Sequence, residues 1–238
     1  MPSDDKVPSK PTASHGVDAF LRQVAARPPT HASGRRGRLL FAMDATASRQ
    51  PTWDQAAHIQ GEMFHSAAGL GGLDIQLAFF RGFGEFRVSA WTDNEAELLR
   101  LMTSVGCLAG QTQLGKVLSH ARNETKRTPI NALVYVGDSF EEDIDSLAKT
   151  AGELGLLGVP VFMFHEGGDP LAAFAFQQIA KLTGGAYCPF DGASAEQLKA
   201  LLGAVAVFAA GGRPALQDLA ARQGGAVKQL AHQMKGGG

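Results

Sequence analysis

Apolar and polar positions along the chain alternate between two patterns. An unbroken apolar run at 39–43, followed by a polar segment, is typical of a strand buried on both faces of a sheet. Comparable segments predict further strands over about 73–80, 85–90, 132–136, 159–164 and 186–188. Apolar residues spaced by threes and fours predict helices over about 52–68, 94–105, 113–126, 143–157, 170–182 and 194–209. We therefore expect an α/β, doubly wound, mostly parallel six-stranded sheet with helices on both faces.

Short local signals refine this arrangement at two places. Residues 81–84 read Arg-Gly-Phe-Gly and separate two predicted strands, which favours an antiparallel hairpin at the edge of the sheet. Asn94 followed by Glu97 has the spacing of a capping box, so a helix should begin at this point.

The two ends of the chain differ in composition from its middle. Residues 1–14 are polar and rich in Pro, Ser, Asp and Lys, and a short helical pattern at 17–24 is stopped by Pro28 and Pro29. We expect a flexible N-terminal arm with a short helix over 1–35, one domain over 36–210, and a helical C-terminal extension or tail over 211–238. The polar beginning and the lack of about 18 consecutive apolar residues lead us to expect a cytoplasmic protein that does not enter a membrane.

Composition excludes several classes of function. Of 238 residues, 45% are hydrophobic and 19% charged, which argues for a packed globular domain. A formal net charge of −1 provides no general attraction for nucleic acid or an anionic membrane. Cys107 and Cys188 are too few for a disulfide framework and lack the spacing of a zinc site, so we expect reduced, buried thiols.

Oxygen-bearing side chains follow two of the predicted strands. Asp44, Thr46 and Ser48 come directly after the strand at 39–43, and their spacing of two places them on one side of an extended segment. Asp138 follows the strand at 132–136, and Thr112 precedes the helix at 113–126. Because ligands bind at the carboxyl ends of parallel strands, we expect these five side chains to meet at that edge.

This set resembles the metal-ion-dependent adhesion site (MIDAS) of the von Willebrand factor A (VWA) family, whose pattern is Asp-x-Ser-x-Ser, then Thr, then Asp. The resemblance extends over about residues 36–210, and Thr46 replaces the commoner Ser with the same type of oxygen. It implies that Thr46, Ser48 and Thr112 contact a metal, and that Asp44 and Asp138 hold it largely through water. The chain looks like the compact intracellular members found in bacteria, which implies a protein-binding function and a partner such as an AAA+ ATPase, a chaperone or another assembly factor.

The donor chemistry agrees with this interpretation. Oxygen donors select a hard cation, and a small site that retains water favours Mg²⁺ over Ca²⁺, with Mn²⁺ as a substitute. Because hydroxyls are neutral ligands, a bound cation would keep much of its charge and attract an anion. We therefore expect an Asp or Glu of another protein to complete the site.

Two neighbouring residues are candidates for contact with such a partner. Phe83 lies at the tip of the predicted hairpin, where it either contacts the partner or only forms the turn. Arg49 follows Ser48, where it either steers an acidic ligand or lies in solvent. The acidic run at 141–143 is expected to stabilise a helix N-terminus.

Ordinary structural roles remain open for the individual site residues. Ser48 could form a turn before Pro51, Thr112 could be an N-cap, and Asp138 could be a turn residue at the end of a strand.

Enzymatic alternatives fit the residues less well. A phosphatase of the haloacid dehalogenase type would use Asp44, Asp138 and Lys116, but it needs a general acid where Thr46 stands. A carboxylate-bridged metal enzyme would need more than the single Glu62-x-x-His65 motif. A dinucleotide site would need glycines within 44–48, and there are none.

The remaining alternative is a metal-independent scaffold that uses its terminal helices. Chelation would not disturb such binding, whereas it would abolish binding through the metal site.

Overall fold

The computed structural model describes residues 36–68, 72–190 and 195–222. It contains a six-stranded sheet in the order β3-β2-β1-β4-β5-β6, with β3 antiparallel to β2 and the other neighbours parallel. The strands are β1 (Gly37–Asp44), β2 (Leu73–Arg81), β3 (Glu85–Val88), β4 (Ala132–Gly137), β5 (Val161–Glu166) and β6 (Ala186–Phe190). The sequence-based expectation of fold class and edge hairpin is confirmed.

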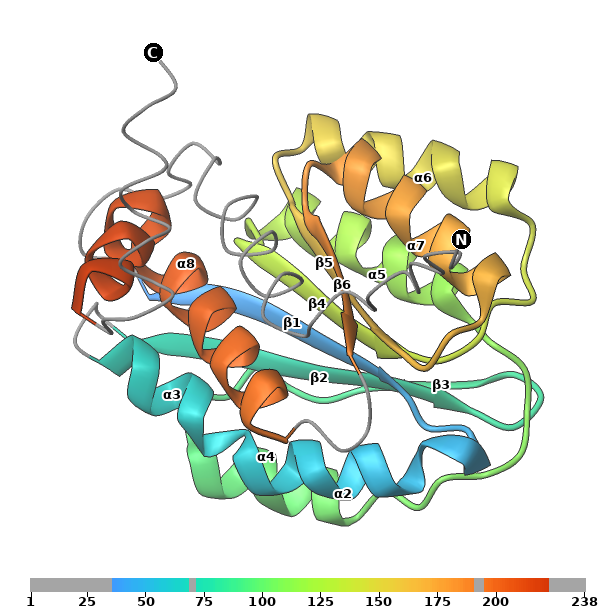
Figure 1. The fold of residues 1–238 in the computed structure, drawn as a ribbon, viewed down its shortest axis with the longest axis horizontal. Helices are drawn as coiled ribbons and strands as arrows, with labels where there is room; N and C mark the ends of the chain where they lie inside the picture. The colour runs from blue at the N-terminus through green and yellow to red at the C-terminus, as the bar shows by residue number, and fades with distance from the viewer. Residues whose placement is uncertain (1–35, 69–71, 191–194, 223–238) are drawn as a thin grey trace, which may run out of the picture.

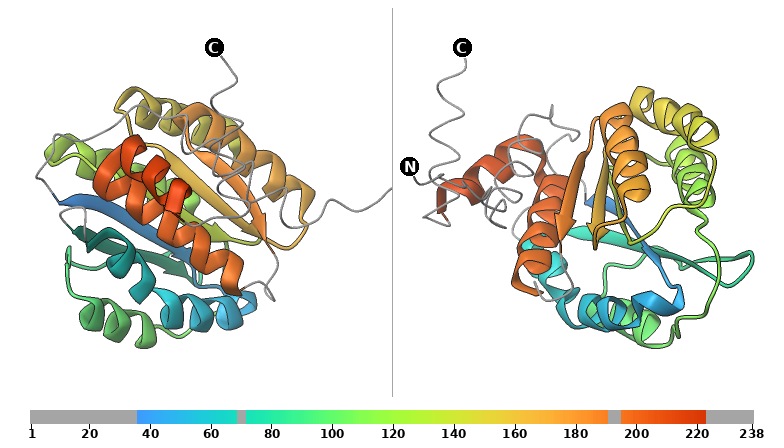
Figure 2. Two further views of the ribbon diagram at one scale, coloured as in Figure 1. Left: turned by 60° about the vertical axis from the view of Figure 1, so that its left-hand side comes forward. Right: turned by 45° about the vertical axis from the view of Figure 1, so that its right-hand side comes forward.

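Helices cover both faces of the sheet, as Figure 1 shows. They are η1 (Ala47–Arg49, a 3₁₀ turn), α2 (Gln50–Ile59), α3 (Gly61–Ala68), α4 (Glu95–Thr103), α5 (Leu114–Arg127), α6 (Ile144–Leu156), α7 (Pro170–Thr183) and α8 (Ala195–Arg222). One layer contains α2, α3, α4 and α8, and the opposite layer contains α5, α6 and α7; Figure 2 shows both layers from two further directions. None of the described helices is long and apolar enough to cross a lipid bilayer.

Two helical segments differ from expectation. The helix predicted over 52–68 is two helices, α2 and α3, which meet at Gln60. The helix predicted to end near 209 continues as α8 to Arg222, with a kink at Gly212, whose φ of 68° is outside the helical range. The expected N-terminal arm and its short helix, and the chain beyond 222, lie outside the described residues.

Each face of the sheet has its own apolar core. Phe41, Trp53 and Phe208 belong to the core beneath α2, α4 and α8, whereas Tyr135 and Phe176 belong to the core beneath α5, α6 and α7. Close approach is visible where α8 crosses β1: a Cβ at Gly37 would lie 2.3 Å from the carbonyl oxygen of Ala209. Both faces are therefore covered, as a parallel sheet requires.

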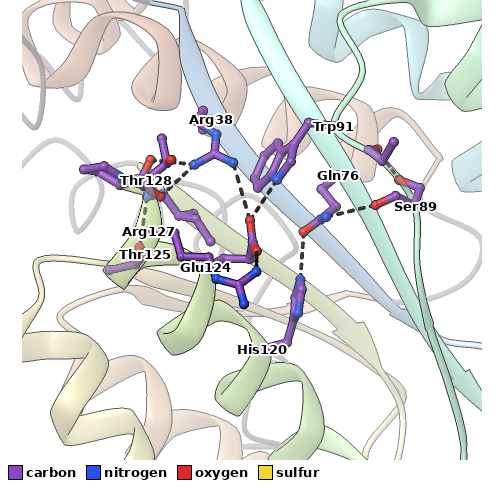
Figure 3. A network of polar contacts seen from close by, with 12 residues as sticks. Arg38, Gln76, Ser89, Trp91, His120, Glu124, Thr125, Arg127 and Thr128 are labelled. Carbon is purple, nitrogen blue, oxygen red and sulfur yellow. Dashed lines mark hydrogen bonds and ion pairs between the residues drawn. The ribbon is translucent and has the colours of Figure 1, made fainter.

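A polar network fixes α5 at the amino edge of the sheet (Figure 3). The guanidinium of Arg38 lies 3.8 Å from the ring centre of Trp91, and it forms an ion pair with Glu124 at 3.5 Å. Glu124 also accepts a 3.0 Å hydrogen bond from the indole of Trp91. Because these contacts hold the last turns of α5, they orient its N-terminus toward the carboxyl edge of the sheet.

Candidate metal-binding site

The site begins where β1 ends at the carboxyl edge of the sheet. Asp44 is fully buried, and its Oδ1 accepts a 2.7 Å hydrogen bond from the backbone N–H of Thr46. The following turn, η1, is closed by a 3.0 Å bond from the N–H of Arg49 to the carbonyl of Thr46. This turn places the hydroxyls of Thr46 and Ser48 3.4 Å apart.

The second loop of the site follows β4. The hydroxyl of Ser48 donates a 2.8 Å hydrogen bond to Oδ2 of Asp138. Ser48 is exposed and Asp138 is half-buried, so this part of the site is open to solvent. The structure thus brings Asp44, Thr46, Ser48 and Asp138 together through direct contacts.

Thr112 lies against the same loop but contacts a different residue. Its hydroxyl accepts a 3.1 Å hydrogen bond from the N–H of Glu141, and its own N–H donates to the Glu141 carboxylate at 3.3 Å. The alternative role of Thr112 as an N-cap is wrong, because the residue at the N-cap of α5 is Gln113. Thr112 therefore contacts the segment that follows Asp138, through Glu141, and not the hydrogen-bonded group of the other four residues.

The acidic run at 141–143 stabilises two helices, which sequence reasoning did not separate. Asp143 caps its own helix, α6, by accepting from the N–H groups of Asp145 and Ser146. Glu142 instead accepts from the N–H groups of Leu114 and Gly115 at the start of α5. Burial raises the pKa of Glu142 above its ordinary value. No local sequence signal indicates a cap supplied by a distant residue.

Arg49 is not where the sequence suggested. Its side chain has 0% exposure, so it neither lies in solvent nor presents a charge on the surface. It forms an ion pair with Glu166, at the end of β5, and the same Glu166 oxygen accepts a hydrogen bond from Thr52. The reason is tertiary: the η1 turn directs residue 49 inward, toward a carboxylate that only the folded sheet supplies.

Phe83 and Leu108 flank the site with exposed apolar side chains. Phe83 is 86% exposed at the β2–β3 turn, and Leu108 is 51% exposed in the loop before α5. The N–H of Leu108 donates to the carbonyl of Ala45 at 3.0 Å, which ties this loop to the turn after Asp44. A Cβ at Gly110 would lie 2.1 Å from the carbonyl oxygen of Gly82, so the loop and the hairpin tip are in close contact.

The donor set suits a hard cation. Oδ2 of Asp44 is buried with no hydrogen-bond partner among the described residues, which leaves a desolvated oxygen available to a cation or to its water. Burial raises the pKa of Asp44 to about 6, and the nearby Asp138 adds to this shift, whereas the hydrogen bond from Thr46 opposes it. Within the described part of the chain, no three His, Cys, Asp or Glu side chains are grouped to hold a metal, so a metal here depends on the hydroxyls.

Comparison with known proteins gives structural likeness only. No family model matches the sequence, and no curated protein matches it. The structure resembles the SpRpn10 VWA domain (TM-score 0.56, 14% identity, 71% of this chain and 94% of that one). It also resembles the vWF domain of the type V pili tip protein Mfa5 from Porphyromonas gingivalis (TM-score 0.54, 11% identity, 74% and 95%).

A third solved structure shows a metal. It is proximal thread matrix protein 1 from the mussel byssus, with a zinc-occupied MIDAS motif (TM-score 0.59, 14% identity, 73% of this chain). The present chain spans 46% of the length of that protein.

Proposed function

Because the chain has the fold of von Willebrand factor A domains, we propose that it is a protein-binding module whose contact with its partner depends on a divalent cation. The observation that carries this proposal is the junction of two loops at the carboxyl edge of the sheet. Ser48 bonds to Asp138 there, and a buried oxygen of Asp44 has no hydrogen-bond partner within the described part of the chain.

The chain's own residues would hold the cation as follows. Thr46 and Ser48 offer hydroxyl oxygens on one turn, and Asp138 faces them from the loop after β4. We assign Thr112 to the same site, next to Glu141. A bound Mg²⁺, or Mn²⁺ in its place, would supply a positive centre for an anionic ligand.

Phe83 and Leu108 would extend the contact beyond the metal. Both are exposed, and hydrogen bonds connect their loops to the turn after Asp44 and to each other. They would suit a partner segment in which apolar residues accompany an Asp or Glu. An AAA+ ATPase or a chaperone in a bacterial cytoplasm is the kind of partner that the family resemblance suggests, and the role proposed is binding rather than catalysis.

Capture of binding proteins from a cell lysate tests the proposal. Tagged wild-type protein is compared in Mg²⁺ and in chelator, and two variants are compared in Mg²⁺: Asp138→Asn, and Asp145→Asn as a matched control. Asp145 is an exposed carboxylate on α6. We expect a protein that is captured by the wild type and by Asp145→Asn in Mg²⁺, and lost in chelator and with Asp138→Asn. The same proteins in every sample would contradict the proposal and would support a metal-independent scaffold.

A further inference from the structure

Arg49 is an unusual component of this site because its cationic side chain is wholly buried. Removing a guanidinium from water is costly unless opposite charges surround it. Glu166 provides one such charge through an ion pair, and Thr52 orients that carboxylate by donating a hydrogen bond to it. Nε and Nη2 of Arg49 have no hydrogen-bond partner among the residues that the structure describes.

The other groups around Arg49 come from several elements. Burial lowers the pKa of Arg49, whereas Asp138 and Asp44, and less strongly Tyr135 and Cys107, favour its charged form. Two of these groups are themselves incompletely satisfied in the described structure: Oδ2 of Asp44 and the hydroxyl of Tyr135 are buried without a hydrogen-bond partner. The hydrogen bonds of the turn place Arg49 beside both carboxylates: its backbone N–H donates to the carbonyl of Thr46, whose own N–H donates to Asp44, and the adjacent Ser48 donates to Asp138. Among the described residues, a buried cation without its full set of partners therefore shares one turn with a buried carboxylate oxygen that also lacks a partner.

We infer that Arg49 is a built-in counter-cation of the site, which stabilises Asp44 and Asp138 when no metal is bound and weakens the binding of a divalent cation. The site contains three carboxylates, those of Asp44, Asp138 and Glu166, and one guanidinium. Their net charge is therefore −2, which a divalent cation balances. The first half of this inference, the stabilisation of Asp44 and Asp138, does not depend on the proposed metal site. The second half, the weaker binding of a divalent cation, rests on that proposed site.

A double-mutant cycle in chelator tests the first half without any metal. The unfolding of wild type, Arg49→Gln, Asp138→Asn and the double variant is followed in urea. We expect Arg49→Gln to raise the unfolding equilibrium constant of the wild type. In the Asp138→Asn background, the same substitution should raise this constant by a factor that is about ten times smaller. Additive effects would overturn the inference. If Arg49→Gln does not fold alone, recovery of folding in the double variant supports the inference, and failure to recover overturns it.

A charge series tests the second half by calorimetric titration with Mg²⁺. Glu166→Gln leaves one net negative charge, the wild type and Arg49→Gln/Glu166→Gln leave two, and Arg49→Gln leaves three. Affinity should rise in that order, with Arg49→Gln on the order of tenfold tighter than wild type and the paired variant close to wild type. Arg49→Lys, which keeps the charge, should also stay close to wild type.

The outcomes separate the two proposals. Equal or weaker Mg²⁺ binding by Arg49→Gln would overturn the opposing role of Arg49 while leaving the metal site intact. If neither the wild type nor any variant binds Mg²⁺ or Mn²⁺, the metal-dependent function and the second half of the inference both fail, and the cycle in chelator still decides whether Arg49 is the counter-cation.

Discussion

The hydroxyl of Ser48 donates a 2.8 Å hydrogen bond to the carboxylate of Asp138, which lies 90 residues further along the chain. The bond joins the loops after β1 and β4, neighbouring parallel strands from which the chain continues to opposite faces of the sheet. In such sheets this point is where ligands bind. The two residues therefore define the position at which a cation would act.

Magnesium should stabilise the folded protein. A cation that binds only the native state raises the free energy of unfolding by about 2.7 kcal/mol at a concentration one hundred times its Kd. For a domain of this size that corresponds to an increase in Tm of about 5–10 °C, measurable by thermal denaturation with and without Mg²⁺. Asp138→Asn should fold and lose the increase, and Asp145→Asn should keep it. An equal increase in all three proteins would place the cation elsewhere.

Glu142 should contribute to stability through α5. Its carboxylate accepts from the N–H groups of Leu114 and Gly115, so Glu142→Ala leaves helix donors without this partner. We expect a loss of about 1–2 kcal/mol in the free energy of unfolding, measured in urea. Asp145→Ala, on an exposed part of α6, should cost less than half as much. Equal losses would show that the contact to α5 is unimportant.

Phe83 should affect partner binding but not the metal site. It is 86% exposed, so Phe83→Ala removes contact area without disturbing the core. Phe83→Ala should bind the Mg²⁺-dependent partner with an affinity at least about tenfold lower than that of the wild type. Its Mg²⁺-induced change in Tm should equal that of the wild type. Leu156→Ala is the matched control, because Leu156 is 92% exposed at the far end of α6. A similar loss with both variants would assign no specific role to the hairpin tip.

His120 should make stability depend on pH. Burial lowers the pKa of His120, whose Nε2 lies 2.8 Å from Oε1 of Gln76 (Figure 3). The pKa of this histidine in the unfolded chain is about 6.5. At pH values between the lowered pKa of the folded protein and about 6.5, the unfolded chain binds more protons than the folded protein does. The contribution of neutral His120 is therefore present above about pH 6.5 and is lost as the pH falls through the lowered pKa.

The measurement compares wild type with His120→Gln. Urea unfolding at pH 5.5 and 7.5 gives the difference in unfolding free energy between the two proteins at each pH. The unfolding free energy of the variant minus that of the wild type should be more positive at pH 5.5 than at pH 7.5. A difference that is the same at both values would exclude His120 as the source.

The local sequence was sufficient to predict the strands and most of the helices. The apolar run at 39–43 lies within β1, Asn94 accepts from the N–H of Glu97 at the start of α4, and residues 81–84 connect antiparallel strands. These features depend on neighbouring residues, so their pattern is visible in the chain. The two helices in place of one at 52–68 were not predicted, since the helical spacing continues through Gln60.

What the sequence determined by itself is therefore the alternation of strands and helices and the types of side chain placed after β1 and β4. Only the tertiary structure decided how these side chains are paired. Arg49 is buried against Glu166, Glu142 supports the start of α5, and Thr112 faces Glu141. The physical reason is that burial and charge compensation depend on residues brought together by the sheet, 27 or more positions apart in these pairs, and no local pattern records such contacts.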